Sequence, residues 1–234
     1  MGAFAESLTT ATQLILHADD ALLHIVGLSL AVSGSACVLA SGFGLLAGAG
    51  LATARFPGRR TLTLLLNTLL ALPSVVVGLV VYLLLSRSGP LGALGILFTP
   101  TAMVVAQTIL VLPVVAALTR QLVADALRGS ADQLRSMGAG AMTRALLLLV
   151  HERWAVLTVL LTAFGRAISE VGAVMVVGGN IEGITRVMTT TIALETSKGD
   201  LPLALALGIV LLAVVLALNA GAHGVREWSL EHHG

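Results

Sequence analysis

The chain has 234 residues, of which 57% are hydrophobic and 11% charged, with a formal net charge of +1 at pH 7. A soluble globule of this length needs more polar surface, so the composition excludes a soluble domain and indicates an integral membrane protein. The single lysine, the 3% aromatic content and the absence of a basic cluster argue against nucleic-acid binding.

The N-terminal part predicts a surface segment followed by a first membrane span. Residues 4–20 mix apolar with polar and acidic side chains, which predicts an amphipathic lead-in over residues 1–21. The first basic residue is Arg55, so a cleavable signal peptide is not expected. The apolar stretch 22–54 is long enough to cross a bilayer.

Small side chains recur every four residues in this first span. The stripe consists of Ala36, Ala40, Gly44, Gly48 and Ala52. Because small residues let helix backbones approach closely, the stripe predicts a packing face, either inside the subunit or between subunits.

Two further spans are predicted, each with a proline inside. Span two covers 62–85 and is interrupted near Pro73, which removes a backbone donor and bends the helix. Span three covers 96–118 and contains Pro113 and Gln107. An amide in hydrocarbon needs a hydrogen-bond partner, so Gln107 is predicted to join helices, with substrate contact as the alternative.

Residues 120–153 form the longest and most basic predicted loop, and a short capped helix is expected inside it. Ser130 and Gln133 have the spacing of a capping box, and Asp132 lies where the dipole of that helix favours a carboxylate. Gly138 can supply a left-handed C-terminal stop. A separately capped helix in a loop predicts a docking element, and the alternative is a helix that only lies on the bilayer surface.

Two more spans complete the chain, with a polar stretch between them. Span four covers 154–177, and a segment rich in Thr and Gly over 181–201 leads to span five at 203–224. A short charged tail, 225–234, follows.

Charged residues near the middle of span four are the most unusual feature of the sequence. Arg166 and Glu170 flank Ser169, and their i,i+4 spacing predicts that they share a helix face. Because an ionisable group in a bilayer is costly and usually functional, we hypothesise that this face lines a hydrated anion pathway. Arg166 would attract the anion and Glu170 would limit how tightly it is held. The alternative is a self-neutralising pair that aids packing.

The distribution of basic residues predicts the orientation. Nine Lys and Arg fall on the side that carries 55–60, 120–153 and the tail, against three on the other side. Five spans with the N-terminus outside and the C-terminus in the cytoplasm satisfy every loop at once.

No pattern in the sequence predicts catalysis or a bound cofactor. No glycine-rich phosphate loop followed by Lys and Ser or Thr occurs, and no Ser/His/Asp or Cys/His arrangement stands out. The six histidines show no metal-ligand spacing apart from the terminal neighbours His232 and His233, for which no ligand role is predicted. Energy for transport is therefore expected from another chain or an ion gradient.

Five stretches of the sequence resemble one family of membrane proteins. Residues 132–138 resemble the cytoplasmic EAA loop of binding-protein-dependent ABC importer permeases: Gly138 matches, Asp132 replaces the glutamate, Gln133 and Leu134 replace the two alanines, and the closing Leu-Pro is absent. The other stretches, 72–79, 106–113 and 164–180, resemble the molybdate/tungstate group of these permeases. Together with 185–200, which looks most like tungstate-uptake permeases, the matches span about residues 28–220.

The resemblance implies an all-α polytopic protein of the type I (MetI-like) importer fold in a bacterial inner membrane. It implies two permease copies, two cytoplasmic ATPase subunits that hold ATP and Mg, and an extracytoplasmic oxyanion-binding protein. The helix at 130–138 would then fit an ATPase groove, with Leu134 and Met137 as apolar contacts. Tungstate is the expected substrate, with molybdate or sulfate as alternatives; the rival classes are a secondary transporter or channel and a purely structural membrane subunit.

Overall fold

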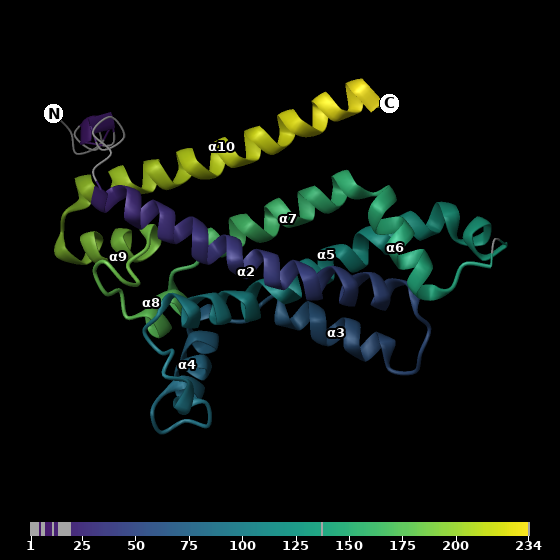
Figure 1. Cartoon of the computed structure of the whole chain (residues 1–234), viewed down its shortest axis with the longest axis horizontal. Coiled ribbons are helices and arrows are strands. Elements are labelled where there is room, and N and C mark those ends of the chain that lie inside the picture. Colours follow the sequence, from purple (N-terminus) through teal and green to yellow (C-terminus); the bar gives the residue numbers. More distant parts are fainter. Residues whose placement is uncertain (1–4, 6–7, 11, 14–19, 137, 234) are drawn as a thin grey trace. The chain divides into compact units, whose positions relative to one another are not determined.

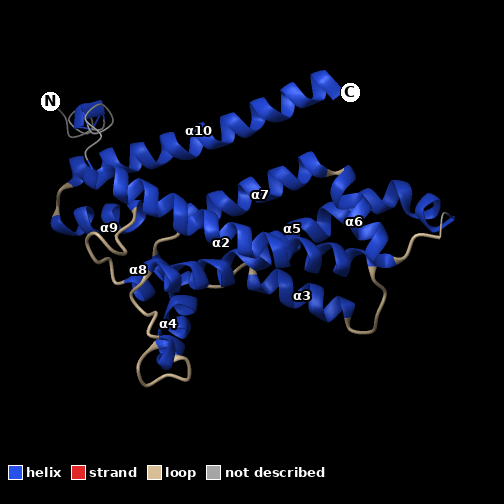
Figure 2. Cartoon of the chain, in the orientation of Figure 1, coloured by secondary structure: helices blue, strands red, loops and turns tan. Residues whose placement is uncertain are grey.

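The structure, a computed structural model, describes residues 5, 8–10, 12–13, 20–136 and 138–233, and every regular element among them is helical (Figure 1; Figure 2). The elements are α2 (Asp20–Thr53), α3 (Arg59–Leu69), α4 (Ser74–Leu85), the 3-10 helix η1 (Gly92–Leu94), α5 (Pro100–Ser136), α6 (Ala141–His151), α7 (Arg153–Ile168), α8 (Gly172–Gly178), α9 (Met188–Lys198) and α10 (Leu201–His233). The all-α prediction is confirmed for this part of the chain. Most of the predicted lead-in, 1–21, lies outside the described residues.

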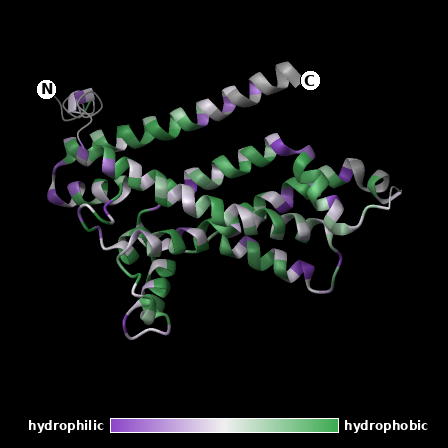
Figure 3. Cartoon of the chain, viewed as in Figure 1, coloured by the Kyte–Doolittle hydropathy of each residue, from purple (hydrophilic) through white to green (hydrophobic). Residues whose placement is uncertain are grey.

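Several of these helices can cross a membrane. Three are long and apolar enough alone: Leu22–Thr53 in α2, Pro100–Gly129 in α5 and Leu201–Gly221 in α10. The count rises to five if the interrupted pairs α3 with α4 and α6 with α7 each form one span. Figure 3 shows the matching apolar colour along α2, α4 and the first part of α10. The prediction of a polytopic membrane protein is therefore confirmed, whereas its orientation stays a prediction.

The chain divides into two compact units, which are described separately. One unit comprises residues 1–34, 74–106 and 168–234, and the other comprises 35–73 and 107–167. The boundaries fall inside α2, α5 and α7, so each of these helices contributes to both units.

In the second unit, α2 packs against α5 through its small residues. A Cβ added at Gly44 would lie 2.8 Å from Cβ of Val115, and one added at Gly48 would lie 2.4 Å from the carbonyl oxygen of Ala116. Because both distances are shorter than a carbon atom tolerates, the close approach of the two helices requires glycine at these positions.

Two apolar clusters fill this unit. The first consists of Cys37, Ala40, Val111, Val115, Val159, Ala163 and Ala167, and the second of Ala49, Ala52, Val123, Ala145 and Leu148. Alanine and valine dominate both clusters, so the helices meet backbone to backbone rather than through long side chains.

In the first unit, α4 packs against α8 and α9 packs against α10. A Cβ at Gly78 would lie 2.8 Å from Cα of Ala173, and one at Gly172 would lie 2.7 Å from Val75. The backbone N–H of Met188, at the start of α9, donates to Oγ of Ser29 on α2 (2.9 Å). Small residues and this interhelical hydrogen bond thus contribute to holding the unit together.

The interruption predicted in span two is confirmed, whereas span four is not the continuous helix expected. Span two is two helices, because α3 ends at Leu69 and α4 begins at Ser74. Pro73 directly precedes α4, where the missing N–H costs little because the first turn of a helix has no acceptor for it. Span four ends as a helix at Ile168 and resumes only at Gly172. Pro113, by contrast, lies inside α5, which continues past it.

The predicted loop at 120–153 is also wrong. Helix α5 continues to Ser136, and after a short turn α6 and the start of α7 occupy most of what remains. Helices α6 and α7 are bent by 82° at their junction. The polar stretch 181–201, for which no helix was predicted, contains α9.

Candidate functional site

The predicted charged face of span four is not a single helix face. Arg166 lies in the last turn of α7, which ends at Ile168, so Glu170 follows the helix instead of standing one turn along it. Ser169 is exposed and lies in the same break. The two residues therefore do not stand one turn apart in a continuous helix, and their pairing stays a prediction.

Glu170 is buried, with 4% of its surface exposed, and it organises the start of α8. Its Oε1 accepts a hydrogen bond from the backbone N–H of Ala173 (3.3 Å), and its carbonyl oxygen accepts one from Oγ1 of Thr189 on α9 (2.9 Å). A carboxylate at this place satisfies a first-turn N–H and interacts favourably with the helix dipole. Glu170 thus connects the break after α7 to both α8 and α9.

The turn after α8 is held by one threonine. Thr185 is fully buried, donates from Oγ1 to the carbonyl of Gly178 (2.6 Å) and accepts from the N–H of Ile181 (2.9 Å). Gly179 and Asn180 both have positive φ, 71° and 51°, so the chain reverses within two residues. The loop that follows is therefore fastened to the end of α8 by side-chain bonds rather than by a helix or strand.

Helix α9 was missed by the sequence analysis although its boundaries carry recognisable signals. Oγ1 of Thr190 accepts a hydrogen bond from the N–H of Val187 (3.0 Å), which caps the first turn. At the other end Lys198 occupies the last turn, and Gly199 follows with φ of 86°. The run of threonines, which are poor helix formers, concealed these signals.

Gln107 joins two helices within the second unit. Only 3% of it is exposed, and its Nε2 donates to the carbonyl of Ala167 near the end of α7 (3.0 Å). Its Oε1 is buried and has no hydrogen-bond partner among the described residues. The amide therefore fixes α5 against the last turn of α7, one residue from Arg166.

The predicted docking helix is the C-terminal end of α5, and part of its predicted capping is wrong. Ser130 lies inside α5, so it does not begin a helix. Asp132 and Gln133 consequently fall in the last turns, where a helix dipole disfavours a carboxylate. The helix continues because no break precedes Ser130. The side chains of Ser130, Asp132 and Gln133, and the whole of Met137, lie outside the described residues.

The predicted stop at Gly138 is present in the backbone. Gly138 has φ of 75°, and the N–H of Ala139 donates to the carbonyl of Leu134 (3.1 Å), which is the six-residue bond of a Schellman ending. Leu134 itself packs against the second apolar cluster of its unit. As placed here, it contributes to the interior of that unit.

Helix α6 exposes apolar residues that the sequence analysis did not single out. Met142, Leu146 and Val150, spaced i, i+4 and i+8, are 62%, 47% and 68% exposed. They share one face, while Ala145 and Leu148 are buried on another. The signals for this helix in the sequence were Gly140 and the apolar run Ala145–Val150.

The described residues offer no ready metal site. No three His, Cys, Asp or Glu within this part of the chain lie close enough together to hold an ion.

No family model matches the chain, but comparison with known proteins finds relatives that align over most of its length. The chain is 42% identical to the tungstate uptake system permease protein of Peptoclostridium acidaminophilum over 95% of its own length and 98% of that protein. It is 43% identical to a probable anion ABC transporter permease protein of Haloferax volcanii, over 85% of this chain and 88% of the relative. The tungstate uptake system permease protein of Campylobacter jejuni is 36% identical over 92% of this chain and 90% of that protein.

Proposed function

The chain belongs to the family of anion ABC transporter permease proteins that includes the tungstate uptake permeases, and from this premise we propose that it is the membrane subunit of an ATP-driven tungstate importer. The observation that carries the proposal is that two relatives named for tungstate uptake align over more than nine tenths of the chain. Molybdate and sulfate are the alternatives, since the relative from Haloferax volcanii is named only for anions.

The permease needs partners that supply energy and substrate. We propose two copies of this chain, two cytoplasmic ATPase subunits that hold ATP and Mg, and an extracytoplasmic protein that delivers the oxyanion. The chain itself would hydrolyse nothing and hold no cofactor, because its sequence contains no phosphate-binding loop. With the N-terminus outside, the segment from the end of α5 through α6 would face the ATPase in the cytoplasm.

Docking to the ATPase would use the end of α5 and the exposed face of α6. Asp132, Gln133, Met137 and Gly138 remain candidate coupling residues at the Schellman ending. The exposed apolar residues of α6 are added to these candidates, because α6 follows that ending: Met142, Leu146 and Val150. Leu134 would act from inside the unit, by holding the end of α5 against the second apolar cluster.

Anion passage would involve the end of α7. Arg166 supplies the positive charge and Ser169 an exposed hydroxyl, both beside the break between α7 and α8. Glu170 has a different part in this proposal from the one expected at first. Its carboxylate holds the start of α8 in place, so its effect on the anion is exerted through the position of that helix.

Uptake by the reconstituted complex tests the substrate. Proteoliposomes that contain this chain, its ATPase and the binding protein should accumulate radiolabelled tungstate only when ATP is present on the side of the membrane where the ATPase lies. Unlabelled tungstate should compete better than molybdate, and sulfate least. Accumulation without ATP would support a secondary transporter instead, and stronger competition by molybdate or sulfate would change the substrate.

The role of Arg166 is tested separately. Arg166→Gln should insert and assemble normally but transport the anion more slowly, because the neutral amide no longer attracts a dianion. A matched control is Arg128→Gln, since Arg128 is an exposed arginine whose partner, Asp125, lies on the same helix at 2.9 Å. Normal uptake by the Arg166→Gln complex would refute the pathway role.

A further inference from the structure

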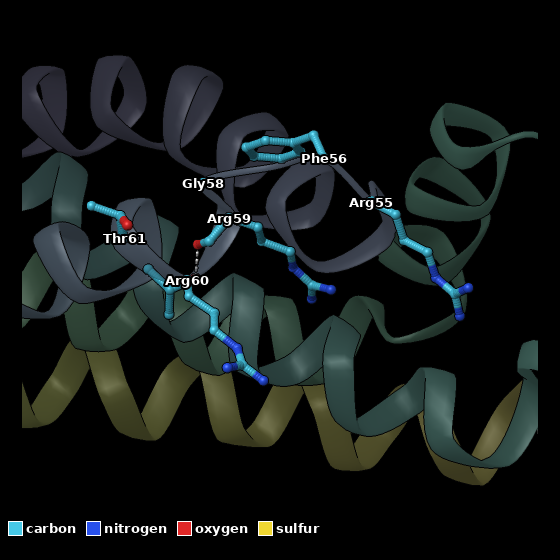
Figure 4. A pocket seen from close by; sticks show the side chains of 7 residues that line it. Arg55, Phe56, Gly58, Arg59, Arg60 and Thr61 are labelled. Carbon is cyan, nitrogen blue, oxygen red and sulfur yellow. Dashed lines mark hydrogen bonds between the residues drawn. The ribbon is translucent and has the colours of Figure 1, made fainter.

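The corner between α2 and α3 carries a cavity lined by arginines. Arg55, Arg59 and Arg60 surround it together with Phe56 and Thr63, and its volume is about 730 Å³. Figure 4 shows the three arginine side chains extending toward the same side of the view, away from the loop and the first turn of α3. Gly58, with φ of 87°, makes the tight turn that brings them together.

Among the described residues, little neutralises these arginines. The sequence contains no Asp or Glu between residues 21 and 124. Arg59 donates to the carbonyl of Ala52 at the end of α2 (3.0 Å), which satisfies a last-turn oxygen but adds no negative charge. Arg55 and Arg60 are exposed and form no ion pair with any residue in the part of the chain that the structure describes. The cluster is therefore complementary to an anion from outside.

An apolar groove is lined by leucines of α2, α3 and α5. Its volume is about 440 Å³, and these leucines dominate its lining: Leu51, Leu62, Leu65, Leu69 and Leu112. No residue of α3 is buried, so its leucines are available to a ligand. Both volumes fall within the range of about 300–1,000 Å³ that is typical of small-molecule sites.

The charged cavity and the apolar groove follow one another along α3. Arg59 precedes Leu62 by three residues, so the two lie on the same side of the helix, one turn apart. Figure 3 shows this change in hydropathy: α3 is hydrophilic at its start and more hydrophobic beyond it. Eleven residues of helix extend about 16 Å, which is close to half the roughly 30 Å thickness of the bilayer hydrocarbon.

We propose that α2, α3 and α5 bind one anionic phospholipid, with its headgroup phosphate on Arg55 and Arg59 and an acyl chain in the leucine groove. A phospholipid combines the two chemistries in the required order: a phosphate that guanidinium groups bind well and a hydrocarbon chain that extends one leaflet deep. A soluble anion would leave the groove empty, and an apolar protein face would leave the arginines without a counter-charge.

Lipid retention by the purified full-length chain tests the proposal. Nanodiscs would contain equimolar phosphatidylglycerol and phosphatidylcholine, and native mass spectrometry would measure which lipid stays bound after release. The wild-type chain should retain phosphatidylglycerol preferentially. The double variant Arg55→Gln/Arg59→Gln should lose this preference by about fivefold for each arginine removed. Arg87→Gln, which removes an exposed arginine from another turn, should retain it.

A second variant tests the groove without changing charge. Ala47 is exposed on α2 and lines the groove, so Ala47→Leu should occupy part of it and reduce retention of phosphatidylglycerol. Ala220→Leu, an equal change at an exposed position of α10, should have no effect.

Three results would overturn the proposal. One is unchanged phosphatidylglycerol preference in the double arginine variant. Another is displacement of the bound lipid by glycerol phosphate at the same concentration as by phosphatidylglycerol, since the groove would then contribute nothing. The third, measured on the complex assembled with the ATPase, is loss of the second permease copy or of the ATPase from the double variant with lipid preference intact, which would assign the corner to a protein interface.

Discussion

Replacing Gly48 by alanine tests how closely α2 and α5 pack. The added Cβ would lie 2.4 Å from the carbonyl oxygen of Ala116 and 2.9 Å from Cβ of Thr119. Ordinary contact begins near 3.4 Å, so α5 would have to withdraw by about 1 Å at this turn. A gap of that size forfeits about a quarter to a half of the dispersion attraction along the contact.

The expected change in the free energy of unfolding is the difference between two opposing effects. Overpacking of a close contact costs about 1–3 kcal/mol, and exchanging glycine for alanine in a helix returns up to about 1 kcal/mol. The matched control is Gly42→Ala on the same helix, where an added Cβ meets nothing within 4 Å. Only the helix-propensity gain applies there, so Gly48→Ala should be less stable than Gly42→Ala by about 1–3 kcal/mol.

Thermal unfolding of the purified variants in one detergent measures this difference. A chain of this size changes its Tm by roughly 2–4 °C for each kcal/mol, so Gly48→Ala should melt several degrees below Gly42→Ala. If both variants melt together, or Gly48→Ala melts higher, the packing of α2 on α5 is not as close as described and the reasoning fails.

Three further changes test individual contacts. Glu170→Ala should destabilise the chain by about 1 kcal/mol through loss of the Oε1 bond to the N–H of Ala173, whereas Glu170→Gln keeps an acceptor; equal melting of the two variants would contradict the cap. Thr185→Val should cost about 1–3 kcal/mol because one buried and one part-buried backbone group lose their partner, and Thr185→Ser should restore the Tm; failure of serine to do so would assign the loss to packing. Gly138→Val, which places a β-branched residue at φ of 75°, should insert normally but hydrolyse ATP without uptake in the assembled complex, and wild-type coupling would remove the docking role.

Helix ends were predicted least well where tertiary contacts decide them. Ser130 and Gln133 have the spacing of a capping box, but α5 continues through both to Ser136. Leu134 packs against the second apolar cluster, so extending α5 buries a side chain that a free loop helix would leave exposed. A local capping signal worth about 1 kcal/mol does not outweigh that burial together with several added backbone bonds.

The break after α7 is a second helix end that the sequence did not predict. Nothing near Ile168 marks a helix end in the sequence, since Ser169 and Val171 are compatible with a helix interior. The break becomes stable because Thr189, nineteen residues further on, supplies a hydrogen bond to the carbonyl of Glu170. Such a partner cannot be identified before the fold is known.

The amino-acid sequence alone determined that this chain lies in a membrane, that its apolar segments can supply up to five spans, and which family its motifs resemble. The membrane location and the spans depend on the free energy of transferring side chains into hydrocarbon. This free energy is a sum over the residues of a segment and can be obtained without knowing which other segments they contact. Only the tertiary structure decided where α5 and α7 end, that Glu170 caps α8, and that arginines and leucines at the start of α3 adjoin one another as cavity and groove. Those features depend on which side chains meet across helices distant in sequence, and pairwise contacts of that kind are not additive along the chain.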